Sequence, residues 1–204
     1  MTPKAKKTDL TTEQKIIHAA RKLFTMKGYE ATKTRDIAKE AGINLALLNY
    51  YFRSKEKLFE IIMQENVGQF MQVISDMVNN ENTSINEKIE LLVNNYIDML
   101  TRLPDMPLFV MNHLKSTPQR TEMRERFMGS YFMKQIQQAM KKGEITTINP
   151  MNIMMNIVSL TIFPFIAKPM VQNNHSLSSE QFYNLMQERK KLIPKWIDAM
   201  LKSK

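Results

Sequence analysis

The stretch from Thr11 to Lys57 constrains this chain most, because it alternates short amphipathic segments with helix-capping residues and single glycines. Thr11 and Gln14 have the spacing of a capping box, and the apolar residues that follow recur on one helical face. Gly28 is expected to end this first helix, since glycine readily adopts the left-handed conformation found at helix C-termini. The pattern therefore predicts a capped amphipathic helix that stops at a glycine.

Two shorter helices are predicted directly after it. Thr32 is expected to cap a second helix, KTRDIAKEA, and Gly42 supplies the left-handed residue of the next turn. Asn44 is well placed as the N-cap of a third helix, LALLNYYF, and Ser54 then caps a longer helix that begins near Lys55. Two short helices joined by a tight turn are typical of a helix-turn-helix, whose second helix enters the DNA major groove. Helical hairpins with glycine turns also occur in other all-α proteins, so this spacing alone leaves both interpretations open.

Positive charge is concentrated in the same part of the chain. The 204 residues carry a formal net charge of +9. Up to Leu58 there are 13 Lys and Arg against 6 Asp and Glu, whereas the remainder has 16 basic against 14 acidic residues. A basic segment joined to a nearly neutral one favours a polyanionic partner for the first part only. On charge alone, a solvated basic surface is an equal alternative.

The composition excludes several classes of site. The chain has no cysteine, which rules out disulfides, thiolate metal sites and cysteine nucleophiles and is compatible with a reducing cytoplasm. The first ten residues, MTPKAKKTDL, are basic and are not followed by an uninterrupted apolar segment, so no signal peptide is predicted. We expect a cytoplasmic protein whose residues 1–10 form a basic, flexible arm. Lys4, Lys6 and Lys7 would add non-specific contacts to a polyanion, although a disordered terminus without a function is the favoured alternative.

A set of spaced residues makes the DNA-binding interpretation specific. They are Ala20, Leu23 and Phe24 in the first helix, followed by Gly28-Tyr29, Thr32, Asp36-Ile37-Ala38, Ala41-Gly42, Tyr50-Tyr51-Phe52 and Ser54-Lys55-Glu56-Lys57-Leu58. Together they resemble the DNA-binding region of TetR/AcrR-type transcriptional regulators. The resemblance implies an N-terminal helix-turn-helix domain and an all-helical C-terminal domain, which binds a small molecule, forms a two-fold dimer and releases the operator when the ligand binds.

We therefore expect an all-α chain with a DNA-binding domain at residues 1–53 and an effector-binding and dimerisation domain at residues 54–204. The expected function is that of a ligand-responsive regulator, most simply a repressor, which binds a palindromic operator as a homodimer and is released by a small, apolar effector. A ligand-independent or architectural DNA-binding protein is the alternative. The expected partners are a double-stranded DNA operator, the effector and a second copy of the chain; no membrane, cofactor or metal is expected.

The expected base contacts lie on the third helix. Asn49 is the strongest candidate, because a carboxamide can hydrogen-bond to adenine N6 and N7 at the same time. Leu45 and Ala46 would contact thymine methyl groups, and Tyr50 would bond a phosphate through its hydroxyl. Family members often carry a lysine near Leu45 and an aromatic residue near Asn49. Affinity is therefore expected to depend more on Lys55, Tyr50 and the basic arm.

The remaining candidates are polar or charged residues that would bond phosphates. Lys33, Thr34 and Arg35 begin the second helix, although an inward-packed Thr34 is an equal alternative. Lys55 combines a cation with the positive N-terminal end of the next helix. The full predicted set is Lys33, Thr34, Arg35, Asn44, Leu45, Ala46, Asn49, Tyr50 and Lys55, while Leu48, Tyr51 and Phe52 are expected to be packed.

Beyond Leu58 the sequence predicts architecture more readily than chemistry. A helix is expected to run through IIMQENVGQFMQVISDMVNN, ahead of the polar loop NNENTSINEK. The segment from Met151 to Val171 is apolar, but polar residues and Pro164 interrupt it, so a buried or interface helix is favoured over a membrane span. The later helical segments are INEKIELLVNNYIDMLTRL, PLFVMNHLKS, TEMRERFMGSYFMKQIQQAMKKG, PMNIMMNIVSLTIFPFIAKPM and SSEQFYNLMQERKKLIPKWIDAMLKSK.

The resemblance implies an effector cavity and a dimer interface in these helices. The chain contains 18 Met, and flexible thioethers suit a pocket for apolar ligands, although ordinary core packing accounts for most of them. The expected cavity residues are Tyr96, Leu100, Phe109, His113, Phe127, Tyr131 and Met155, with His113 either a polar anchor or an ordinary structural histidine. The last two long helices are expected to form a four-helix bundle across the dimer axis through Ile157, Leu160, Phe163, Tyr183, Met186, Ile193, Trp196 and Met200.

An enzyme is not favoured. His18, His113 and His175 lie in separate segments without metalloprotease spacing, and the sequence has no glycine-rich phosphate loop. Glu122 and Glu125 are three residues apart, as on one helical face, but the surrounding TEMRERF is typical of an exposed ion-pair surface. No catalytic residue is predicted.

Overall fold

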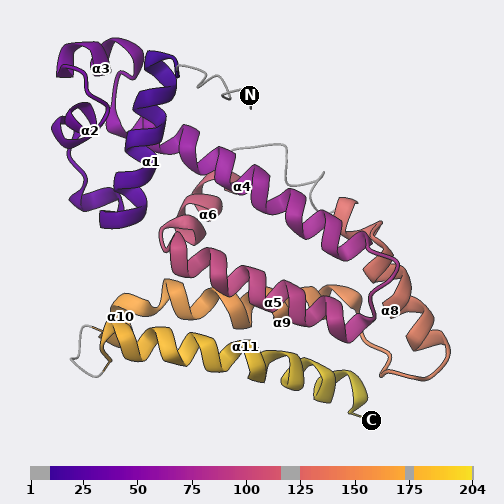
Figure 1. The fold of residues 1–204 in the computed structure, drawn as a ribbon. Helices are drawn as coiled ribbons and strands as arrows, with labels where there is room; N and C mark the ends of the chain where they lie inside the picture. The colour runs from indigo at the N-terminus through magenta and orange to yellow at the C-terminus, as the bar shows by residue number, and fades with distance from the viewer. Residues whose placement is uncertain (1–9, 116–124, 173–176, 204) are drawn as a thin grey trace, which may run out of the picture. The chain divides into compact units, whose positions relative to one another are not determined.

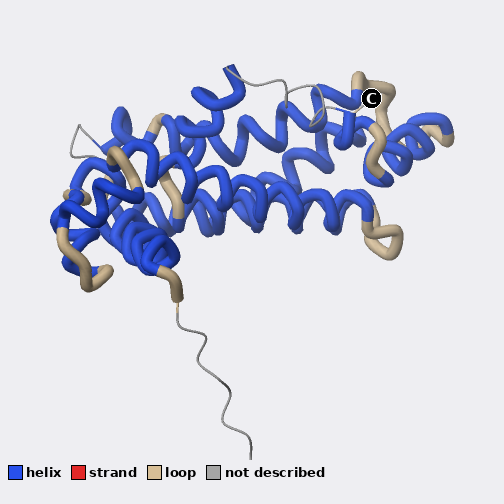
Figure 2. The backbone as a smooth tube through the Cα atoms, turned by 90° about the horizontal axis from the view of Figure 1, so that it is seen from above, coloured by secondary structure: helices blue, strands red, loops and turns tan. Residues whose placement is uncertain are grey.

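The computed structural model of the chain describes residues 10–115, 125–172 and 177–203 (Figure 1). All regular structure within these ranges is helical, and none of the described residues forms a strand (Figure 2). The predicted all-α class is confirmed. Several residues named above lie outside the described ranges, namely Lys4, Lys6, Lys7, Glu122 and His175.

The chain divides into two compact units, residues 1–66 and 67–204. The boundary lies inside one long helix, α4 (Lys55–Asn79), which was expected to belong wholly to the second domain. Because α4 contributes to both units, its backbone links them directly.

The first unit contains α1 (Thr12–Ala31), α2 (Thr34–Glu40), α3 (Leu45–Tyr51) and the start of α4. Its core consists of apolar side chains from all four helices, as the amphipathic pattern predicts. The buried residues are Ile16, Ala19, Ala20, Leu23, Phe24, Ile37, Ala38, Leu48, Phe52, Leu58 and Ile62.

Side-chain caps begin three of these helices. Thr11 Oγ1 accepts a hydrogen bond from the Gln14 amide at 3.2 Å, and Gln14 Oε1 accepts one from the Thr11 amide at 3.0 Å. Asn44 Oδ1 accepts from the Leu47 amide at 2.8 Å, and Ser54 Oγ accepts from the Lys57 amide at 3.2 Å. The predicted caps at all three positions are confirmed. Each satisfies a backbone donor that the helix itself leaves unpaired.

The predicted roles of Gly28 and Thr32 need correction. Gly28 breaks α1 with a φ of 78°, but the helix then resumes and ends only at Ala31. Thr32 does not cap α2; its buried hydroxyl donates to the Gly28 carbonyl at 2.7 Å and so closes the end of α1. Lys33 is the N-cap of α2 and makes no side-chain capping bond. The α2 helix therefore begins with uncapped backbone amides.

The second unit consists of the remainder of α4 and the later helices, among which α5 packs against both α9 and α11 (Figure 1). Their buried faces follow helical periodicity, with Ile89, Val93 and Ile97 on α5. The helices are α5 (Ile85–Arg102), α6 (Met106–Lys115), α8 (Tyr131–Lys141), α9 (Pro150–Ile166), α10 (Lys168–Gln172) and α11 (Ser179–Lys202).

Two segments that were predicted to be single helices are divided. In the segment predicted over residues 121–143, the described residues 125–143 do not form one helix, because Ser130 begins α8 anew by accepting a hydrogen bond from the Met133 amide at 3.4 Å. The apolar segment 150–170 is split at Ala167, after which the short α10 begins. Within the described ranges no helix is both long enough and apolar enough to cross a membrane.

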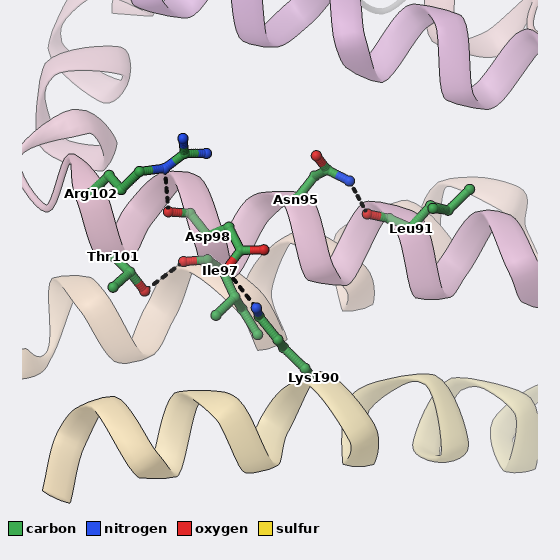
Figure 3. A network of polar contacts seen from close by, with 7 residues as sticks. All are labelled: Leu91, Asn95, Ile97, Asp98, Thr101, Arg102 and Lys190. Carbon is green, nitrogen blue, oxygen red and sulfur yellow. Dashed lines mark hydrogen bonds and ion pairs between the residues drawn. The ribbon is translucent and has the colours of Figure 1, made fainter. Parts of the chain in front are cut away.

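A polar cross-link joins α5 to α11. Lys190 Nζ donates to Asp98 Oδ1 at 2.5 Å, and Lys190 is largely shielded from solvent (Figure 3). Partial burial strengthens such a pair relative to one on an open surface. The pair fixes the two helices in register beside their apolar contacts.

Lys88 is a fully buried lysine at the start of α5. Its ammonium donates to the Asn80 and Thr83 carbonyls at 2.6 Å each and to the Thr83 hydroxyl at 2.7 Å. Burial lowers the pKa of Lys88. The ammonium thereby holds the connection between α4 and α5, where Gln135 of α8 also donates to the Thr83 carbonyl at 2.9 Å.

Replacing Lys88 with Met should destabilise the protein by about 1 to 3 kcal/mol, because three partly buried hydrogen bonds from a charged donor would be lost while side-chain volume is nearly kept. Urea unfolding followed by circular dichroism measures this change. The exposed Lys134 on α8 provides a matched control, and Lys134→Met should leave stability nearly unchanged. Equal effects of the two substitutions would show that the Lys88 hydrogen bonds contribute nothing specific.

Candidate nucleic-acid interface

The burial of α3 determines which of its side chains face solvent. Leu48 is fully buried and Phe52, directly after the helix, is nearly so. The opposite side carries Ala46, Asn49 and Tyr50, all exposed, with the Tyr50 side chain 80% exposed. These three predicted contact residues therefore lie together on the solvent side of one short helix.

Two further residues belong to this exposed surface. Tyr51 was expected to be packed but is 42% exposed, and its ring meets that of Tyr50 edge to face at 5.4 Å between centroids. Leu47 was not predicted as a contact and is also exposed. Leu45 is half-buried. Helical spacing could have identified Leu47, because it points about 100° away from the buried Leu48 and so falls outside the packed side of the helix.

Asn44 caps α3, and this role restricts its contacts with a ligand. Its side-chain oxygen accepts the hydrogen bond from the Leu47 amide that caps α3. Only its amide nitrogen remains as a donor to a ligand.

Lys55 is directed into the first unit. Its ammonium donates to the Tyr29 carbonyl at 3.0 Å and to the Thr32 carbonyl at 3.2 Å, and lies 4.0 Å from the centroid of the Tyr29 ring. A cation at these carbonyls stabilises the end of α1, since helix C-termini carry partial negative charge. This arrangement gives Lys55 an anchoring role in place of the outward phosphate contact that the sequence predicts.

Tyr29 joins the same anchor. Its hydroxyl donates to Glu56 Oε1 at 2.8 Å. Burial, followed by the hydrogen bond to Glu56, raises the pKa of Tyr29 to about 12, so the hydroxyl stays protonated and remains a donor at neutral pH. Lys55 and Glu56 thus fix the start of α4 against the end of α1.

Several cations of the first unit are neutralised by neighbours. Lys22 pairs with Glu40 at 2.5 Å, Lys27 lies 3.8 Å from Asp36, and Arg21 pairs with Glu65. These pairs reduce the positive charge available to a polyanion.

Other cations remain available. Lys33, Arg35 and Arg53 are exposed, and their side chains make no hydrogen bond or ion pair with any residue that the structure describes. Thr34 is half-buried at the first position of α2. Arg53 was missing from the predicted contacts, although its position directly after the third helix could have indicated it. The uncharged exposed side of α3 is therefore accompanied by unpaired cations at the start of α2 and the end of α3.

The predicted cavity residues differ in their burial. Leu100 is buried in the core and Met155 is exposed to solvent, so neither matches the predicted position in a cavity wall. Tyr96 packs edge to face on Phe70 at 4.8 Å, and its burial raises its pKa to about 12. Phe109, Phe127 and Tyr131 are half-buried, and the His113 side chain lies outside the described part of the structure.

An open polar groove lies between α5 and α11, close to the pair in Figure 3. None of the predicted cavity residues lines it. Its residues are Asn86, Glu90, Asn94, Gln187, Glu188, Lys190, Lys191, Pro194, Lys195 and Asp198.

The predicted interface residues fall into two groups. Ile157, Met186 and Ile193 are buried within the single chain, so their assignment to an interface is wrong: they already pack against their own neighbours. Phe163, Tyr183 and Trp196 are exposed, and Leu160 and Met200 are half-buried. The exposed group remains available to a second copy.

Comparison with known proteins identifies the first unit. Residues 16–62 match the sequence model of the family described as bacterial regulatory proteins, tetR family. Over 95% of its length the chain is 26% identical to the probable HTH-type transcriptional regulator YttP of Bacillus subtilis, covering 96% of that protein. Residues 16–62 therefore form a DNA-binding domain of the TetR type. The chain's relatives are regulators and not enzymes, as predicted.

Other transcriptional regulators resemble the chain over part or most of its length. The biofilm operon icaADBC negative regulator IcaR of Staphylococcus aureus is 32% identical over 102 residues, which are 47% of this chain and 55% of IcaR. A TetR/AcrR regulator from Thermobifida fusca has the same fold, with a TM-score of 0.61 at 22% identity, covering 89% of this chain and 96% of that one. FadR of Bacillus subtilis, solved with stearoyl-CoA, has a TM-score of 0.52 at 19% identity, covering 88% and 96%.

Replacing Lys55 with Met should destabilise the protein by about 1 to 3 kcal/mol, because two carbonyls at the end of α1 lose a charged donor. Arg53→Ala should change stability by no more than about 0.5 kcal/mol. It should nevertheless weaken binding to all DNA and reduce the slope of the log binding constant against log salt concentration by about 1. Urea unfolding and binding titrations at several salt concentrations measure both effects. Unchanged stability for Lys55→Met, with weaker binding on all DNA, would restore the outward phosphate contact.

Proposed function

We propose that this chain is a homodimeric, ligand-responsive repressor of the TetR type that binds a palindromic operator. The observation that carries the DNA-binding part is the exposed side of α3, accompanied by the unpaired cations Lys33, Arg35 and Arg53. Phosphate contacts position a protein on the duplex, and base contacts on the recognition helix give specificity. A regulator of chromosomal DNA would work in the cytoplasm.

In this proposal, two surfaces of the first unit meet DNA. Lys33, Thr34 and Arg35 at the start of α2, together with Arg53 after α3, bond phosphates. The side of α3 that carries Asn49 and Tyr50 enters the major groove, with Asn49 as the principal base-reading side chain.

The homodimer is supported by apolar side chains that the single chain leaves uncovered on α9 and α11. Phe163 is 64% exposed and Trp196 is 43% exposed, with Leu185 and Tyr183 also exposed on α11. Large exposed aromatic residues are enriched at protein interfaces. A two-fold dimer would present two recognition helices about 34 Å apart, one turn of DNA, and so would bind a palindromic site.

Arg189 lies in the seam between these two helices. Its guanidinium donates to the Leu160 carbonyl at 2.8 Å and lies 5.4 Å from the centroid of the Trp196 ring. Its Nε is buried without a hydrogen-bond partner among the described residues, and burial lowers the pKa of the group. A second copy packed on Trp196 would cover this cation further and supply an acceptor.

An apolar effector is supported by two similarities. A B. subtilis relative that is 26% identical over 111 residues is named a fatty acid metabolism regulator protein, and FadR was solved with stearoyl-CoA. Ligand binding would favour a conformation in which α4 carries the DNA-binding helices away from their operator positions. A ligand-independent repressor remains the second candidate, favoured by the close packing of Leu100 in the core.

Replacing Asn49 with Ala should weaken binding to the operator by about 1 to 3 kcal/mol and relax the base preference at one position in each half-site. Binding to random DNA should change little, because the substitution removes no charge. Fluorescence anisotropy on operator and random duplexes measures both. Equal losses on the two kinds of DNA would exclude a base-reading role for Asn49.

Replacing Trp196 with Glu should weaken the dimer by at least tenfold, because a charge would be buried at the interface centre. Sedimentation equilibrium measures the dimer dissociation constant. Leu91→Glu, at another exposed apolar position but on α5, is the matched control and should not alter association. A dimer that tolerates Glu at position 196 would require a different interface.

A further inference from the structure

We infer that the base pairs beneath α3 are A·T pairs, recognised through thymine methyl groups and adenine edges and not through guanine or cytosine. This inference rests on the proposed function, because it requires α3 to lie in the major groove. It specifies the DNA sequence class that the same surface selects.

The side chains of α3 suit A·T pairs chemically. The helix reads LALLNYY and carries neither an acidic nor a basic side chain. Its exposed side presents one carboxamide, Asn49, among the apolar or aromatic side chains of Ala46, Leu47, Tyr50 and Tyr51. The only strong paired donor and acceptor on this side of the helix is therefore an amide.

Each base pair presents its own pattern of hydrogen-bond donors, acceptors and methyl groups in the major groove. Guanine is recognised mainly by Arg or Lys, which donate to O6 and N7, and cytosine N4 donates to a carboxylate. No residue of α3 offers either group. A carboxamide matches adenine N6 and N7, and apolar side chains contact the thymine methyl group, which cytosine lacks. The composition of α3 therefore discriminates in favour of A·T pairs.

The core and the N-terminal cap fix the orientation of α3. Burial of Leu48 and Phe52 on one side prevents the helix from rotating about its axis, and the Asn44 cap fixes its first turn. The Asn44 amide nitrogen can donate to thymine O4 and to guanine O6 alike, so it does not alter the preference. Ala46 and Leu47 thus stay exposed to solvent.

The nearby cations do not cancel this preference. Arg53 follows α3 and Arg35 lies on α2, so neither belongs to the helix that is placed in the groove. Phosphate contacts from such residues raise affinity for every sequence equally. If Arg35 contacts a guanine, that guanine lies outside the base pairs covered by α3, and Arg35→Ala identifies it.

The test uses the full-length protein and duplexes selected from random DNA. Each thymine of the selected site is replaced in turn by deoxyuridine, which lacks only the 5-methyl group. A buried methyl group is worth roughly 0.8 kcal/mol, so at least one replacement per half-site should weaken binding about fourfold. The positions covered by α3 are those whose base preference changes in Asn49→Ala or Leu47→Ala.

A variant identifies the side chain that contacts the methyl group. Leu47→Ala keeps the fold, because Leu47 is exposed, and circular dichroism checks this. We expect one deoxyuridine effect to disappear in Leu47→Ala or in Ala46→Gly and to persist in Arg35→Ala.

The possible failures are distinguishable. Enrichment of G·C pairs at the positions covered by α3, or deoxyuridine replacements without effect, would overturn the A·T preference while leaving specific DNA binding intact. Failure to enrich any sequence would overturn the proposed function, and the A·T preference with it.

Discussion

The burial of Leu48 and Phe52 is the constraint on which the rest of the functional surface depends. These two side chains pack into the core of residues 1–66 and leave the opposite side of α3 in solvent. Because side chains on a helix have fixed angular spacing, this one packing contact exposes Ala46, Asn49 and Tyr50 together. A helix of two turns has little stability alone, so its position depends on the core beneath it.

The anchor at the end of α1 supports the same core from the other side. Lys55 bonds two carbonyls there, and Glu56 accepts from Tyr29. The start of α4 is thus fixed to the unit that contains α3, while the rest of α4 belongs to the second unit. A change in the position of the start of α4 would therefore reach α3 through these contacts, as the proposed ligand response requires.

Local signals predicted the first unit well. The caps at Thr11, Asn44 and Ser54 and the turn at Gly42 depend on residues within four positions, so sequence spacing specifies them. Thr32 and Lys55 were misassigned because both act across tertiary contacts: Thr32 closes the preceding helix, and Lys55 reaches back to residues far behind it in sequence. Side-chain direction at such positions is decided by the fold.

The second unit shows a different limit of prediction from sequence. Helical periodicity indicates which side of α9 or α11 is apolar, but does not show whether the chain itself or a second copy covers it. Ile157, Met186 and Ile193 were assigned to an interface for this reason, although the chain buries them itself. Phe163 and Trp196 are also large apolar residues of these two helices, but they remain exposed. Cavity residues are harder still to predict, because a cavity depends on how several helices pack together.

In the proposed function, α3 is the part of the TetR-type DNA-binding domain that meets DNA. Photo-crosslinking tests it most directly, with benzoylphenylalanine placed at position 50 or at position 183, both exposed tyrosines in the native chain. On a selected duplex, we expect position 50 to crosslink to DNA and position 183 to give no DNA adduct. DNA adducts at position 183, with none at position 50, would contradict the assignment of α3 as the recognition helix.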